Sequence, residues 1–80
     1  MIMLTKAERE IRYNNRQLVN KIMDLRDQRV RLQRKVAELE DKQFWESDNF
    51  TASDLYLLAY YKNQITHIKE IEAGLRNQIK

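Results

Sequence analysis

The sequence contains no cysteine and no proline, and it has only one glycine, Gly74, and one histidine, His67. Without cysteine, neither a disulfide nor a cysteine-based zinc site can form, and a single histidine excludes a histidine-rich metal site. The scarcity of glycine and proline removes the two residues that most often interrupt helices. A chain of 80 residues therefore has to gain stability from helix packing, with help from self-association or from a partner protein.

Patterns that support catalysis are also missing. The chain has no glycine-rich phosphate-binding loop, no recognisable nucleophile with a neighbouring base, and no paired carboxylates in a cleft. We expect a non-enzymatic protein with no catalytic residues, no cofactor and no metal. The segment Met1 to Leu4 is too short for a signal peptide, and no apolar run is long enough to cross a membrane, so a cytoplasmic location without membrane association is expected.

A first helix is predicted over residues 6–41. Thr5 and Glu8 have the spacing of a capping box, and no helix breaker follows until about Asp41. Aliphatic residues then recur every seven positions, at Ile11, Leu18, Leu25, Leu32 and Leu39. This repeat is typical of the d positions of a coiled coil, with Asn15, Ile22, Arg29 and Val36 at the a positions. Asn15 and Arg29 are costly residues for such a seam.

A turn is predicted over residues 42–50 and a second helix over residues 51–79. Ser47, Asp48 and Asn49 favour a turn, and Thr51 with Asp54 forms a second helix start. Apolar residues then follow a 3-4 spacing that Glu72 interrupts: Leu58, Tyr61, Ile65, Ile68, Leu75 and Ile79. Gly74 is a candidate helix end, but Leu75 and Ile79 continue the 3-4 spacing, which favours a helix that extends past Gly74.

These elements predict an all-α fold, an antiparallel two-helix hairpin that forms one coiled-coil-like domain over residues 1–80. A short connection makes neighbouring helices antiparallel, and the longer first helix should overhang the second by two turns. Self-association or a partner would complete the hairpin into a helical bundle.

More apolar side chains are present than one hairpin can bury. The first helix carries a second apolar row, and the second helix begins with residues that are apolar around its whole circumference. We expect the surplus to bind a partner, and the candidate residues are Val19, Met23, Val30, Trp45, Leu57 and Tyr60. The alternative is that these side chains only thicken the core of the hairpin, with Trp45 covering its end.

Charge is distributed unevenly along the chain. Residues 6–35 carry a net charge of +6, whereas residues 36–54 carry −5. Arg9, Arg12 and Arg16 lie on one helical face, and a denser group follows at Arg26, Arg29, Arg31, Arg34 and Lys35. This group is interpreted as a solvated helix face, as a contact for an acidic protein surface, or as a contact for nucleic-acid phosphates.

The leading functional hypothesis is a protein–protein interaction module, such as an adaptor, a co-chaperone or a small inhibitor. Its partners would be a larger protein, a second copy of the chain, or both, with a dimer as the first expectation. The alternatives are a nucleic-acid-binding regulator that uses the arginines of the first helix, and a self-assembling structural subunit.

Overall fold

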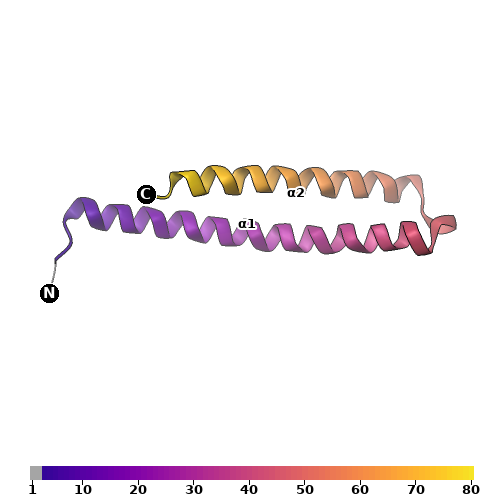
Figure 1. Cartoon of the computed structure of the whole chain (residues 1–80), viewed down its shortest axis with the longest axis horizontal. Coiled ribbons are helices and arrows are strands. Elements are labelled where there is room, and N and C mark those ends of the chain that lie inside the picture. Colours follow the sequence, from indigo (N-terminus) through magenta and orange to yellow (C-terminus); the bar gives the residue numbers. More distant parts are fainter. Residues whose placement is uncertain (1–2) are drawn as a thin grey trace.

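Two long antiparallel helices make up the structure, a computed structural model that describes residues 3–80 (Figure 1). Helix α1 (Lys6–Trp45) leads through a single 3₁₀ turn, η1 (Ser47–Asn49), to helix α2 (Ala52–Gln78). The hairpin is a rod of 67 × 20 × 13 Å, and residues 3–80 contain no strand. The all-α hairpin predicted from the sequence is thus confirmed. Met1 and Ile2, which belong to the expected domain, lie outside the described residues.

Threonine side chains fix the start of both helices. The Thr5 hydroxyl accepts a hydrogen bond from the backbone N–H of Glu8 at 3.1 Å, but the return bond that a complete capping box requires does not form among the described residues. At the start of α2 both bonds are present. The Thr51 hydroxyl accepts from the N–H of Asp54 at 3.2 Å, and the Asp54 carboxylate accepts from the N–H of Thr51 at 3.0 Å. The predicted start of the second helix is correct.

The end of α1 differs from the prediction, because the helix continues through Phe44 and Trp45 instead of ending near Asp41. Neither glycine nor proline precedes Ser47, so nothing breaks the helix until the Ser47–Asn49 segment. Helix α2 passes through Gly74 to Gln78, close to the expected end. Beyond it, the Asn15 side chain exchanges two hydrogen bonds with the backbone of Lys80, at 2.8 and 3.1 Å.

The predicted a and d positions form the seam between the helices. Ile22 on α1 and Leu58, Ile65 and Ile68 on α2 are its buried apolar residues. Ile11 continues the heptad spacing but remains exposed, because Lys80 lies beside Asn15 and the first turns of α1 extend beyond it (Figure 1). Neither helix of the described chain has a stretch long and apolar enough to cross a lipid bilayer.

Acid should weaken the junction between the turn and α2. The pKa of Asp54 lies below its usual value of 3.8, because its carboxylate accepts hydrogen bonds from the Thr51 N–H and from Lys42 Nζ at 2.9 Å. A carboxyl with a lowered pKa in the folded state stabilises the fold above its unfolded pKa, and this contribution disappears as the pH falls through the folded value. We expect the urea concentration at the midpoint of unfolding to decrease as the pH is lowered from about 5 to about 2.

The control for this experiment is Asp48→Asn, compared with Asp54→Asn. Asp48 lies in η1, shortly before Asp54, but forms no salt bridge or side-chain hydrogen bond with any residue in 3–80. The Asp54 variant should flatten the acid dependence of the urea midpoint, whereas the Asp48 variant should keep it. Equal flattening by both variants would contradict the role assigned to Asp54.

Candidate interaction surfaces

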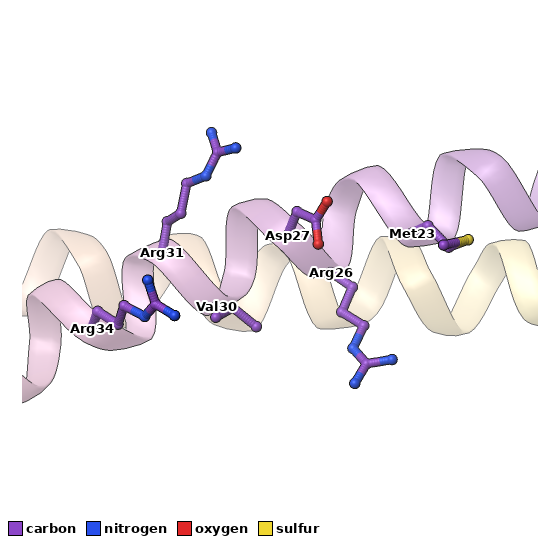
Figure 2. A pocket seen from close by; sticks show the side chains of 6 residues that line it. All are labelled: Met23, Arg26, Asp27, Val30, Arg31 and Arg34. Atoms are coloured by element: carbon purple, nitrogen blue, oxygen red, sulfur yellow. The ribbon is translucent and has the colours of Figure 1, made fainter.

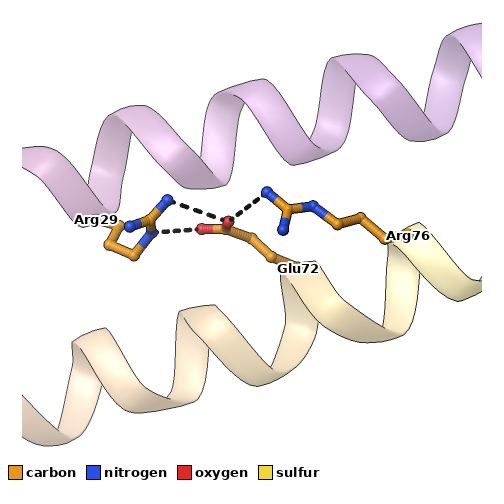
Figure 3. Close-up of polar contacts among 3 residues, drawn as sticks. All are labelled: Arg29, Glu72 and Arg76. Carbon is orange, nitrogen blue, oxygen red and sulfur yellow. Dashed lines mark hydrogen bonds and ion pairs between the residues drawn. The ribbon is translucent and has the colours of Figure 1, made fainter.

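A buried ion pair occupies the middle of the seam. Glu72, the apparent interruption of the second helix's pattern, is the one buried charged residue of the described chain, at 3% exposure. Its carboxylate accepts hydrogen bonds from Arg29 Nε at 2.9 Å and from Arg29 Nη2 at 3.4 Å, and Arg76 Nη2 lies at 3.7 Å (Figure 3). Arg29 interrupts the apolar heptad pattern of α1, and Glu72 interrupts that of α2. The two charges neutralise each other across the seam.

Two flanks border the seam, and ion pairs and shared grooves show which residues lie on each. On α2 the seam-facing residues set the heptad, with Leu58, Ile65 and Glu72 at a and Tyr61, Ile68 and Leu75 at d. Glu40 and Lys62, both at heptad position e, form a salt bridge of 3.3 Å. Lys35 and Leu57, both at position g, line a common groove. The e positions of the two helices therefore share one side of the hairpin, and the g positions share the other. Position b lies next to e on the helix circumference, and position c lies next to g.

The six candidate partner-binding residues do not form a single surface. Val19, Met23 and Val30 occupy e and b positions of α1, whereas Leu57 and Tyr60 occupy g and c positions of α2. All five except half-buried Val30 are exposed. The heptad positions were assigned from the sequence on the first helix alone, so these two groups were not separated. The surplus apolar surface is thus divided between opposite sides of the hairpin.

Trp45 does not cover the end of the core. Its side chain is 78% exposed on the last turn of α1, and its ring packs against that of Phe44, with ring centroids 4.8 Å apart in an edge-to-face arrangement. The alternative interpretation of Trp45 as a core cap is therefore wrong.

The arginine-rich segment of α1 does not make one basic patch either. The Arg29 guanidinium forms an ion pair with the Glu72 carboxylate, and Lys35 Nζ lies over the Tyr61 ring at 5.3 Å from its centroid. Figure 2 shows Arg26 and Arg31 extending to opposite sides of α1. Neither of them, nor Arg34, forms a salt bridge with any residue in 3–80. Basic residues that lie close together in the sequence thus point in different directions around the helix.

A different set of basic residues shares one side. We use the name "basic face" for the e and b positions of both helices. Its charged members are Arg9, Arg12, Arg16, Arg26, Lys62, Lys69 and Arg76, against one acid, Glu40, which pairs with Lys62. Its main apolar members are Val19, Met23, Val30 and Leu55.

A shallow groove opens on the outer side of α1 beside the basic face. Met23 and Val30 supply its apolar lining, while Arg26, Arg31 and Arg34 supply cations and Asp27 supplies the one carboxylate (Figure 2). An apolar side chain that enters this groove would be surrounded mainly by guanidinium groups. The groove therefore suits a ligand with an apolar centre and acidic margins.

Metal binding finds no support in the part of the chain that the structure describes. No group of three or more histidine or acidic side chains is arranged to hold a metal ion within residues 3–80. Comparison of the chain with protein families, with curated proteins and with solved structures finds no match.

Proposed function

We propose that the protein is an interaction module that binds an acidic amphipathic helix of a larger protein on its basic face. The observation that supports this proposal is the charge pattern of that face. Basic side chains from both helices are joined by only one acid, Glu40, and apolar residues lie between them. A third helix placed along the hairpin would extend its coiled coil and cover Met23 and Val30.

The energetic roles of the two kinds of residue differ. Burial of the exposed Met23 and the half-buried Val30 would provide affinity, at about 25 cal/mol for each Å² of apolar surface removed from water. The arginines and Lys69 would accelerate association and select an acidic partner over a basic one. Arg26 and Lys69 suit this role because neither forms a salt bridge with any residue in 3–80.

Nucleic-acid binding is the second candidate, and the unpaired arginines of α1 favour it. The dispersal of the Arg26–Lys35 segment around the helix places it second, since phosphates would contact only part of the group at once. Apolar side chains among the cations are also better matched by a protein helix than by a sugar–phosphate backbone.

Charge reversal on opposite sides of α1 tests the proposal. The probes are a fluorescent helical peptide, with leucines at a and d and glutamates on the flanks, and a labelled DNA duplex. We expect the wild-type chain to bind the peptide. Arg26→Glu should weaken that binding by about tenfold or more, because it replaces a basic side chain that would face the glutamates of the peptide by an acidic one. Fluorescence anisotropy measures both affinities at fixed salt.

The matched control is Lys21→Glu, which makes the same reversal of charge at an exposed g position on the other flank of α1. Its affinity for the peptide should stay within about twofold of wild type after correction for net charge. Equal losses for both variants would show a nonspecific charge effect and reject the basic face as the site. Preference for the duplex, with a steep salt dependence, would establish the nucleic-acid function instead.

A further inference from the structure

The opposite side of the hairpin has a different character. Every g and c position of α2 between Ser53 and Gln78 is uncharged, with His67 counted as neutral. We name these positions the uncharged strip. In a chain with 34% charged residues, such a strip along a whole surface helix is unusual. Leu57, Tyr60 and Ile71 are exposed on it, and the Tyr60 ring rests edge-on against Tyr61 at a centroid distance of 5.8 Å.

Gly74 lies on the same strip and has no role within the hairpin that requires glycine. Its backbone has no positive φ, and a Cβ atom added there would meet nothing within 4 Å. A glycine inside a helix costs about 1 kcal/mol relative to alanine, so its presence calls for a reason outside the hairpin. A bare backbone allows a neighbouring helix to approach closely.

We infer that a second copy of this chain covers the uncharged strip, so that two α2 helices pack antiparallel around a twofold axis near Gln64. The strip is self-complementary about that residue. Leu57 and Ile71 lie one heptad before and one heptad after Gln64, so each Leu57 would face Ile71 of the other copy. Gly74 would face the small Ser53 of the other copy at both ends. Twofold interfaces require this kind of self-matching surface.

The charge distribution of the rod selects the same arrangement. The open end is basic, with +6 over residues 6–35, and the turn end is acidic, with −5 over residues 36–54. An antiparallel pair places the turn of each copy beside the open end of the other, which aligns opposite charges, whereas a parallel pair would align like charges. The basic face could not form a twofold interface of this kind, because two copies of it would repel each other.

The inference does not depend on the proposed function, but it adds to it. Since the g positions and the e positions lie on opposite flanks of each hairpin, a dimer formed through the uncharged strip leaves both basic faces accessible on its outside. The assembly would be a four-helix unit with two identical binding faces.

Sedimentation equilibrium of the full chain tests the inference. We expect a mass about twice the 9.8 kDa of one chain at concentrations of roughly 10 to 300 µM, and a single-chain mass for Leu57→Glu. The introduced acid would lie in a groove where Lys35 and Lys42 outnumber the one carboxylate, Glu38, so the hairpin itself should keep its helicity by circular dichroism. The matched control is Leu55→Glu, a change of an exposed leucine on the basic face, which should leave the mass doubled.

Cross-linking tests the geometry separately, since the chain has no cysteine of its own. Gln64→Cys should give a cross-linked dimer with a short bismaleimide, because the two residues would meet at the twofold axis. Thr66→Cys, on the opposite flank, should give none. A single-chain mass for the wild type at the highest concentration would overturn the inference. So would a dimer that survives Leu57→Glu, or one that cross-links equally through both cysteines.

Discussion

Replacing Arg29 by alanine is expected to lower the free energy of unfolding by about 3 kcal/mol. The Glu72 side chain is only 4% exposed, and the substitution removes both hydrogen bonds from the Arg29 guanidinium. A buried carboxylate without its main partner is costly. Arg76, at 3.7 Å and largely solvated, would retain part of the pairing and keep the loss at the lower end of the usual range. Urea denaturation followed by circular dichroism measures the change.

The double variant Arg29→Leu and Glu72→Leu distinguishes charge from packing. Replacing both members of a buried ion pair by apolar residues is often neutral or stabilising, so the double variant should regain at least the wild-type stability. A double variant as unstable as Arg29→Ala would show that the loss comes from the packing of the arginine stem. We also expect the two helices of the double variant to pack in more than one register, because the ion pair contains the one buried charged residue of the described chain.

The second large effect is expected at Leu58. This residue is 5% exposed, among the most buried of the apolar residues in the described chain, and Leu58→Ala removes most of its contacts with α1. We expect a loss of about 2 to 5 kcal/mol from the removed burial and the cavity left behind. A small domain with a total stability near 5 kcal/mol would be partly unfolded at room temperature. Thermal unfolding followed at 222 nm measures this loss.

Leu55→Ala is the control, since it makes the same chemical change a few residues away. Leu55 is 54% exposed at position e beside the seam, so its substitution should change stability by no more than about 0.5 kcal/mol. A loss at Leu55 comparable to that at Leu58 would mean that the basic face is covered in the folded state.

Much of the fold was predictable because heptad spacing reports directly on which residues face the seam. The a and d positions from Asn15 to Leu39 are all buried or half-buried in the structure, and between them Val30 at position b is half-buried as well. The start of α2 was also predictable, since Thr51 and Asp54 act within one turn of helix. The end of α1 was not, because the apolar pattern stops near Asp41 while Phe44 and Trp45 neither favour nor prevent a helix, so the turn was predicted to begin too early.

The candidate surfaces were harder to predict, since they depend on how one helix is aligned with the other. Arg29 and Glu72 each looked unfavourable when its own helix was considered alone, and only their alignment across the seam reveals a pair. An arginine and a glutamate at core positions of two antiparallel helices were the signal that could have set this register. The division of Met23 and Tyr60 between opposite flanks was missed for another reason, because heptad positions were assigned on the first helix alone.

The unequal length of the two helices gives the rod graded local stability. The first turns of α1 have backbone hydrogen bonds but extend beyond the end of α2, whose last residue, Gln78, shares a groove with Ile11 and Asn14. A helical segment without tertiary neighbours frays at little free-energy cost, whereas the middle of the rod opens only when the whole hairpin separates. The N-terminal turns of α1 are therefore the natural place for local opening, and a ligand that orders them would tighten that end while leaving the packed middle unchanged.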